Sequence, residues 1–183
     1  MDLKGSKTEA NLNTAFAGES MARNKYTFFA KQATKEGYFQ IAEIFNETAD
    51  NELAHAKIWY KILTQGALPG EILDTKANLQ IAMDGEHHEW SEMYKGFAET
   101  AREEGFNDIA FLFEKVGAIE KEHDHRYTVI KKQLEGGELS ARKEAVTWHC
   151  LNCGHLHVGL EAPIKCPVCS DPQGMFDVYS RGY

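Results

Sequence analysis

The sequence predicts a mainly α-helical protein in which a four-helix bundle holds two metal ions and a small four-cysteine domain follows it. Three observations support this fold class. Two Glu-x-x-His motifs lie 68 residues apart, the helical pattern around them repeats at the same spacing, and all four cysteines fall between Cys150 and Cys169. We therefore expect a bundle domain at residues 1–140 and a four-cysteine domain at residues 145–183.

The composition excludes several classes of protein. The 183 residues carry a formal charge of −8 and have a sequence pI near 5.5, so the chain lacks the basic surface that binds nucleic acid. No run approaches the length of apolar residues that spans a membrane. The N-terminal segment has no apolar stretch of the signal-peptide kind, and the cysteine spacing suits a metal ion better than disulfides. We expect a cytoplasmic protein with no nucleic-acid or membrane partner.

Four long helices are expected within the first 135 residues or so. Apolar residues recur there at alternating steps of three and four, which is typical of helices with one buried stripe. Gly37 and Gly105 predict short turns, so that the helices pair as two antiparallel hairpins. Residues 65–75 predict a longer crossover connection, and Gly136 and Gly137 end the fourth helix.

Each Glu-x-x-His pair lies inside the buried stripe of its helix. Residues three apart on a helix face the same way, so each pair presents a carboxylate and an imidazole to one point. An ionised carboxylate among apolar side chains is unfavourable unless it binds a cation. One Glu from each remaining helix completes the ligand pattern of ferritin-like di-metal proteins, which suits iron or manganese. The predicted ligands are Glu52 with His55, Glu120 with His123, and the added Glu19 and Glu86.

A competing frame exists in the fourth helix, because Glu122 and His125 also form a Glu-x-x-His pair. These two residues fall off the apolar stripe, and the repeat does not select them. We expect them at the surface. His87 and His88 are expected to lie in solvent or to support a metal ligand.

The repeat is broken at one place, in the third helix. Tyr26 matches Tyr94 at an offset of 68, whereas Glu19 matches Glu86 at an offset of 67. The third helix therefore carries one extra residue between Glu86 and Tyr94. A single inserted residue produces a π-bulge, and such bulges are frequent at functional sites. We expect a bulge here that turns Glu89 toward the metals.

The four cysteines form two Cys-x-x-Cys pairs separated by twelve residues, Cys150 with Cys153 and Cys166 with Cys169. This spacing is typical of a tetrathiolate metal site. By itself it fits a structural zinc ribbon as well as a one-iron site. Because metals that change oxidation state in the bundle need electrons, and a one-iron tetrathiolate can relay them, the first domain favours iron.

Taken together, these residues resemble the rubrerythrin family, in which a ferritin-like four-helix bundle precedes a small rubredoxin-like domain. Two segments carry the closest resemblance, Trp-His-Cys-Leu-Asn-Cys-Gly-His at residues 148–155 and Cys-Pro-Val-Cys at residues 166–169. Ser170 stands where a free-standing rubredoxin has Gly, and the gap between the cysteine pairs is shorter. Both departures fit the rubrerythrin version of the domain.

The resemblance implies a non-haem peroxidase that reduces hydrogen peroxide to water in oxidative stress defence. It implies two irons in the bundle and one iron, or a zinc, in the tetrathiolate site. The implied partners are an external reductase or rubredoxin-type electron donor and a second copy in a head-to-tail homodimer. Two alternatives are a ferroxidase or iron-storage protein, and an electron carrier with a structural zinc ribbon.

The resemblance also implies a role for each site residue. Two carboxylates would bridge the irons, two would be terminal ligands, and one imidazole would be a permanent ligand; these are Glu52 and Glu120, Glu19 and Glu86, and His123. The second iron would bind His55 when reduced and Glu89 when oxidised. Tyr26 and Tyr94 would donate hydrogen bonds to the carboxylates.

Overall fold

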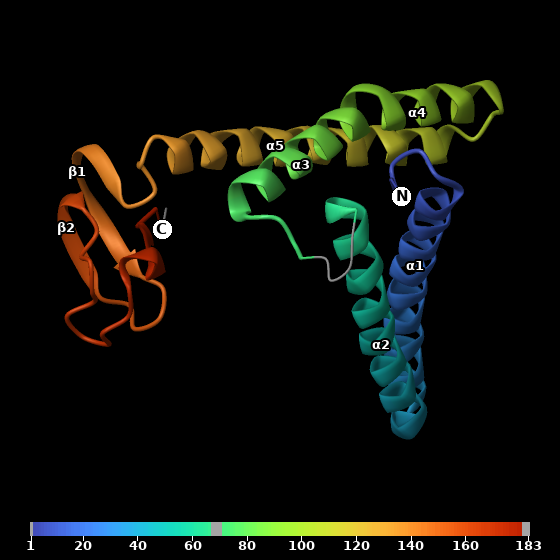
Figure 1. The fold of residues 1–183 in the computed structure, drawn as a ribbon, viewed down its shortest axis with the longest axis horizontal. Coiled ribbons are helices and arrows are strands. Elements are labelled where there is room, and N and C mark those ends of the chain that lie inside the picture. The colour runs from blue at the N-terminus through green and yellow to red at the C-terminus, as the bar shows by residue number, and fades with distance from the viewer. Residues whose placement is uncertain (1, 67–70, 181–183) are drawn as a thin grey trace. The chain divides into compact units, whose positions relative to one another are not determined.

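The computed structural model describes residues 2–66 and 71–180, and it divides into two compact units, Met1–Leu73 and Asp74–Tyr183 (Figure 1). The connection predicted over residues 65–75 lies partly outside the described residues, at positions 67–70. Each unit is a set of elements that pack on one another, and each carries one of the two Glu-x-x-His motifs.

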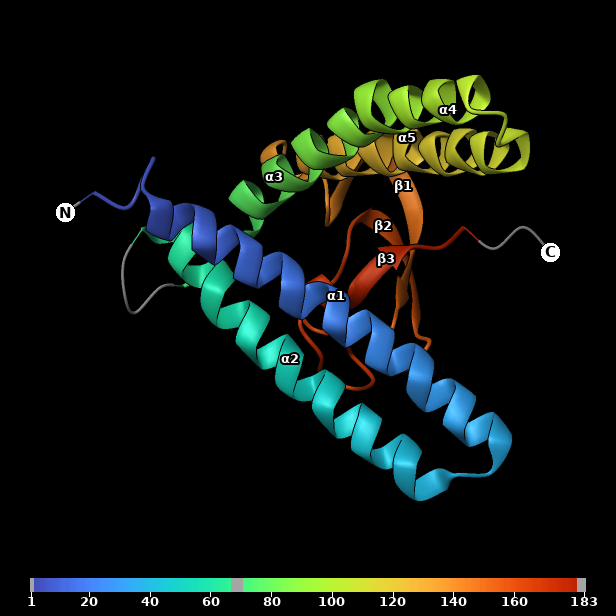
Figure 2. The ribbon, with the colours of Figure 1, turned by 90° about the vertical axis from the view of Figure 1, so that its right-hand side faces the viewer.

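The first unit is an antiparallel hairpin of two long helices, α1 (Lys7–Glu36) and α2 (Phe39–Gln65) (Figure 2). The Ser6 hydroxyl begins α1 by accepting a hydrogen bond from the backbone N–H of Glu9 at 3.1 Å. Gly37 ends α1 in the left-handed conformation, with a φ of 85°, as the predicted turn requires. The buried seam of the hairpin consists of alanines, namely Ala30, Ala33, Ala42, Ala49 and Ala56.

The second unit begins with another hairpin. Three helical segments follow one another along its first arm, and they pack against the second arm, α5 (Figure 1). Gly105 joins the arms with a φ of 88°, as predicted. Alanines again form the buried seam, here Ala98, Ala101 and Ala110. The segments are α3 (Thr75–His88), the π-helix η1 (Glu89–Met93), α4 (Tyr94–Glu103) and α5 (Asn107–Glu135).

Large apolar side chains on both hairpins remain exposed although the alanine seams are buried. Phe28 and Ile44 of the first hairpin and Phe111 and Leu112 of the second have more than half of their surface exposed. Small seam residues allow two helices to approach closely, but they bury little apolar area. These hairpins are therefore amphipathic pairs of the kind from which four-helix bundles are built.

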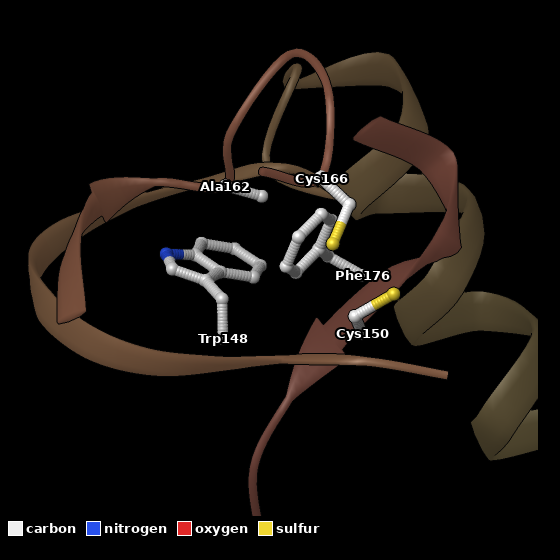
Figure 3. Packing of buried hydrophobic residues seen from close by; sticks show 5 residues of the cluster. All are labelled: Trp148, Cys150, Ala162, Cys166 and Phe176. Atoms are coloured by element: carbon white, nitrogen blue, oxygen red, sulfur yellow. The ribbon is translucent and has the colours of Figure 1, made fainter. Parts of the chain in front are cut away.

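The small domain is a three-stranded antiparallel sheet in the order β2-β1-β3, built from β1 (Ala141–Cys150), β2 (Leu156–Glu161) and β3 (Phe176–Val178). The Trp148 side chain is fully buried, and its indole N–H donates to the backbone carbonyl of Gly159 at 3.1 Å. Figure 3 shows the rings of Trp148 and Phe176 together, with Cys150 and Cys166 beside them. Two of the predicted metal ligands thus belong to the domain core.

The structure confirms the predicted fold class, a mainly α ferritin-like protein with a small four-cysteine domain. It also confirms the predicted end of the fourth helix, because α5 stops at Glu135 and Gly136 caps it. Among the residues that the structure describes, no helix is both long and apolar enough to cross a bilayer.

Candidate functional site

The first hairpin brings three predicted ligands together, one from α1 and two from α2. The Nδ1 atom of His55 lies 3.0 Å from a carboxylate oxygen of Glu52 and 3.8 Å from one of Glu19. The pKa of Glu52 is lowered because Glu19 and His55 hydrogen-bond to its carboxylate. One carboxylate from each helix and one imidazole thus present ligand atoms within 4.8 Å of one another.

The second hairpin repeats this arrangement with the matched residues. The Nδ1 atom of His123 lies 2.7 Å from a carboxylate oxygen of Glu120 and 3.6 Å from one of Glu86. The pKa of Glu86 is raised, first by burial and then by the negative charge of Glu120. The duplication found in the sequence is therefore a duplication of ligand geometry, with the same ring nitrogen directed at the same pair of carboxylates.

The competing Glu-x-x-His frame does not join either cluster. Glu122 and His125 are both exposed, and neither belongs to a group of ligand atoms close enough to hold a metal within the described parts of the chain. The structure thus brings together the residues of the frame that the apolar stripe and the repeat favour, and their binding of a metal stays a prediction.

The predicted π-bulge is present as η1, at the place where the repeat is broken. The backbone N–H of Tyr94 donates to the carbonyl of Glu89, five residues earlier, which is the π-type bond. Glu89 is half-buried, and its negative charge contributes to the raised pKa of both Glu86 and Tyr94. It stands outside the compact cluster of Glu86, Glu120 and His123, so its direction toward the metals stays a prediction.

The two predicted tyrosines occupy matched aromatic clusters. Tyr26 packs with Phe29 and Phe45, with ring centroids 6.1 and 6.2 Å away. Tyr94 packs in the same way against its two neighbouring rings, Phe97 and Phe113, at 6.2 and 6.1 Å. The pKa of Tyr94 is raised by burial and by nearby carboxylates, so its hydroxyl keeps the proton that a hydrogen-bond donor needs.

Asp124 is a residue that the sequence reasoning missed. One of its carboxylate oxygens accepts a hydrogen bond from the indole N–H of Trp90 at 2.9 Å and lies 3.1 Å from Nδ1 of His87. The Trp90 and His87 contacts lower the pKa of Asp124. The partners of Asp124 lie 34 and 37 residues earlier in the chain, and no local spacing signals such a contact.

The four cysteine sulfurs form the third cluster, as predicted. The Sγ atoms of Cys150 and Cys169 lie 3.6 Å apart, and so do those of Cys153 and Cys166. A tetrahedron of sulfurs at about 2.3 Å from a central ion has edges of about 3.8 Å, so the spacing fits a single metal ion.

Each Cys-x-x-Cys turn closes in the same way. The residue after the second cysteine has a positive φ, 80° at Gly154 and 67° at Ser170, and its N–H donates to the carbonyl of the first cysteine at 2.9 Å. Ser170 is the departure noted in the sequence, and it adopts the left-handed conformation that Gly adopts in the other turn. The backbone of the turn is thus kept although the glycine is not.

Comparisons with known proteins agree with this arrangement. Residues 10–131 match the rubrerythrin family, and residues 148–177 match the rubredoxin-like domain of rubrerythrin. The chain belongs to the rubrerythrin family. It is 46% identical to the rubrerythrin of Nitratidesulfovibrio vulgaris, over 96% of each chain. It is 44% identical to Rubrerythrin-1 of Clostridium acetobutylicum, over 99% of this chain and 98% of the relative.

Membership of the rubrerythrin family makes the chain a di-iron, rubredoxin-like protein of oxidative stress and an oxidoreductase. The donor sets fit the irons of this family. Two clusters rich in carboxylate oxygen, each with one imidazole, suit the di-iron site, and four thiolates suit the single iron. The metal-binding and cofactor predictions are thereby confirmed at the level of the family.

The opposite pKa shifts in the two clusters predict opposite pH dependences of stability for the metal-free protein. The pKa of Glu86 is raised above its usual 4.5, so the folded protein holds this proton more tightly than the unfolded chain. Glu86→Gln is therefore expected to increase the free energy of unfolding at about pH 7, and the gain should vanish below the unfolded pKa.

Glu52→Gln serves as the matched comparison, because the pKa of Glu52 is lowered. The ionised group contributes stability above pH 4.5 that is lost as the pH falls through the folded pKa, so this substitution is expected to destabilise at about pH 7. Urea unfolding followed by helical circular dichroism at about pH 7 and about pH 3 measures both effects. Equal signs for the two variants would contradict the assignment.

Proposed function

We propose that this protein is a peroxidase that reduces hydrogen peroxide to water with electrons passed through its own four-cysteine iron site. Each turnover takes two electrons and two protons and breaks the O–O bond to give two waters. The observation that carries the proposal is the presence, in one chain, of two matched carboxylate–imidazole clusters and a rubredoxin-like tetrathiolate.

The proposed ligand roles are those that membership of the rubrerythrin family implies for the matched positions. Glu52 and Glu120 would bridge the irons, Glu19 and Glu86 would be terminal ligands, and His123 would be a permanent ligand. The bound irons supply Lewis acidity toward peroxide and the electrons that reduce it. The protein would contribute a ligand set that matches the charge of each oxidation state, with the His55 imidazole as a ligand in the reduced form and the Glu89 carboxylate in the oxidised form.

The difference between the two histidines supports this exchange. The His55 side chain is 50% exposed, whereas that of His123 is 35% exposed and closer to its partner carboxylate. A more exposed imidazole has more room to leave and return. Glu89, which lies on the π-helix, has no counterpart in the regular helix α1. The more exposed histidine thus lies in the first hairpin, and the extra carboxylate lies in the second.

Tyr26 and Tyr94 orient the carboxylates. Each tyrosine is fixed by two phenylalanine rings, so its hydroxyl has little freedom to turn away. A protonated hydroxyl donates to a carboxylate oxygen and holds the direction of that ligand. The raised pKa of Tyr94 supports this donor role at neutral pH.

The proposed partners are hydrogen peroxide, an external reductase or rubredoxin-type electron donor, and a second copy in a head-to-tail homodimer. In such a dimer the tetrathiolate iron of one subunit serves the bundle of the other. Mixing a variant that lacks the bundle irons with one that lacks the tetrathiolate iron tests this arrangement. Restored turnover in the mixture supports transfer between subunits, and no restoration rejects it.

The four cysteines are free and suit a metal ion, so the fold requires no oxidising compartment. This supports a cytoplasmic location.

Glu89→Gln tests the peroxidase proposal. The variant is expected to lower peroxide turnover by about 10- to 100-fold while it keeps all three irons, because a ligand for the oxidised form is lost. Turnover is measured as peroxide consumed with reduced rubredoxin as donor, and iron is measured by elemental analysis.

Glu92→Gln is the matched control in the same helical turn. Its side chain is 74% exposed and contacts His88 at 3.5 Å, so turnover should stay close to that of the unmodified protein. Equal turnover in both variants would reject the role of Glu89. Accumulation of an iron mineral without peroxide turnover would favour the ferroxidase or storage alternative, and a colourless zinc-loaded cysteine site would favour the electron-carrier alternative.

A further inference from the structure

The π-helix is fastened to α5 by one carboxylate. Asp124 accepts from the Trp90 indole N–H at 2.9 Å and pairs with Nδ1 of His87 at 3.1 Å through the same oxygen. The His87 and Trp90 rings meet edge to face, with centroids 5.1 Å apart. His87 and Trp90 stand on either side of Glu89 in the sequence, so the two contacts hold the chain just before and just after the unmatched carboxylate.

The far end of the π-helix is also fitted closely to α5. A Cβ atom added at Gly117 would lie 3.1 Å from Cβ of Tyr94, which is tighter than ordinary van der Waals contact. An alanine at position 117 would therefore require α5 or Tyr94 to move by a few tenths of an ångström. Two positions of α5, Asp124 and Gly117, therefore contact the chain on either side of Glu89.

The first hairpin provides an internal comparison. At the offset of 68, Asp124 corresponds to Ala56 and Gly117 corresponds to Ala49, and both alanines are buried in the seam against α1. Helix α1 is regular over its whole length. The π-helix and its two special contacts on α5 thus occur together in one half of the duplication, and they are absent together from the described residues of the other half.

We propose that Asp124 is a positioning residue that holds Trp90 and His87 and thereby fixes the π-helix so that Glu89 stays beside Glu86. The Asp124 side chain is only 17% exposed, so water competes weakly for its oxygens. Asp124 also follows His123 directly in α5, which ties the segment carrying Glu89 to the helix carrying His123. The inference rests on the proposed role of Glu89 as a ligand of the oxidised form.

Four variants of the full-length protein test this role. Trp90→Phe removes the N–H and keeps an aromatic ring, and Asp124→Ala installs the residue type of the first hairpin. Asp124→Asn keeps one oxygen for Trp90. Trp59→Phe is the matched control, because the buried Trp59 indole nitrogen has no hydrogen-bond partner among the described residues.

The first measurement is backbone hydrogen–deuterium exchange over residues 89–94 in the metal-free protein. Exchange should be about ten-fold faster in Trp90→Phe and Asp124→Ala, because the π-helix is released. It should be unchanged in Trp59→Phe and nearly unchanged in Asp124→Asn. Unchanged exchange in Trp90→Phe and Asp124→Ala would overturn the proposal.

The second measurement is the midpoint potential of the di-iron site in the iron-loaded protein. A loosened Glu89 stabilises the oxidised form less, so Trp90→Phe and Asp124→Ala should shift the potential upward, in the direction of Glu89→Gln. Faster exchange without a shift of potential would make the contact merely structural and would overturn the proposal. If Glu89→Gln itself leaves the potential unchanged, the proposed ligand role of Glu89 fails, and the positioning role of Asp124 fails with it.

Discussion

Exchange of the tetrathiolate iron for zinc is expected to abolish peroxide turnover with an external donor while the small domain stays folded. Zinc takes the same four sulfur ligands at about the same distance but has no accessible change of oxidation state. The 3.6 Å sulfur spacing accommodates either ion. The domain therefore keeps its shape and loses only the ability to relay electrons.

The measurement compares the iron and zinc forms with reduced rubredoxin as donor, and then with a small chemical reductant that reaches the bundle irons directly. We expect the zinc form to be inactive in the first assay and able to complete a single turnover in the second. Full donor-dependent turnover of the zinc form would show that electrons enter the bundle without passing through the cysteine domain.

Removal of any metal from the four-cysteine site should unfold the domain. Cys150 and Cys166 are two of the five residues in its buried core, beside Trp148 and Phe176 (Figure 3). Apparent binding free energies of about 10–16 kcal/mol for zinc in comparably small domains exceed what such a core supplies. Near-ultraviolet circular dichroism during chelation follows this loss, and retained signal would contradict it.

Metal affinity of the cysteine site should also rise with pH, since thiols release protons when they bind a metal. Burial disfavours the Cys166 thiolate, but backbone N–H groups of Cys169 and Val168 lower the pKa of Cys166 to about 7. The backbone N–H of Asp171 lowers the pKa of Cys169, but burial and the neighbouring cysteines together outweigh it and raise this pKa to about 12. Cys166 thus ionises before Cys169, which keeps its proton until the metal displaces it.

Glu120→Gln is expected to abolish iron binding in the bundle and to lower peroxide turnover by more than about 100-fold. In the proposed site a neutral amide at position 120 could not bridge two cations as a carboxylate does, and the neighbouring Glu86 would lose the cation that compensates its charge. In the metal-free state the same change removes a repulsion that raises the pKa of Glu86, so the hairpin should become more stable.

Glu122→Gln is the control, because Glu122 belongs to the competing frame on the same helix and is exposed. It should bind two irons in the bundle and turn over peroxide normally. Elemental analysis, urea unfolding of the metal-free proteins and the coupled assay provide the three readouts. Loss of iron in Glu122→Gln with retention in Glu120→Gln would reverse the choice of frame.

Much of the site could be predicted from residue spacing, because the spacing of two residues along a helix fixes whether their side chains point to the same face. The Glu-x-x-His pairs, the turns at Gly37 and Gly105 and the Cys-x-x-Cys pairs are all local patterns, and each is present in the structure. The π-helix was predictable for a related reason. The two copies of the hairpin can be aligned with each other, so one inserted residue in the second copy changes the offset between matched residues from 67 to 68.

Contacts between residues far apart in the chain were not predictable in this way. Nothing near Asp124 indicates that its carboxylate meets Trp90 and His87, because the contact depends on how α5 packs against η1 and α3. His87 was expected either in solvent or in support of a ligand, and its side chain is indeed 62% exposed while it pairs with Asp124. Only packing distinguishes such a residue from a solvated one.

The sequence by itself determined the identity of the two Glu-x-x-His motifs, the duplication that relates them and the position of the extra residue. These are properties of register, and helical register is fixed by the backbone alone. The tertiary structure decided how α5 packs against the π-helix. Asp124 accepts a hydrogen bond from Trp90, and Gly117 lies close to Tyr94. The alanines of the first hairpin at both positions show that this fit depends on side chains brought together by packing, which no local pattern encodes.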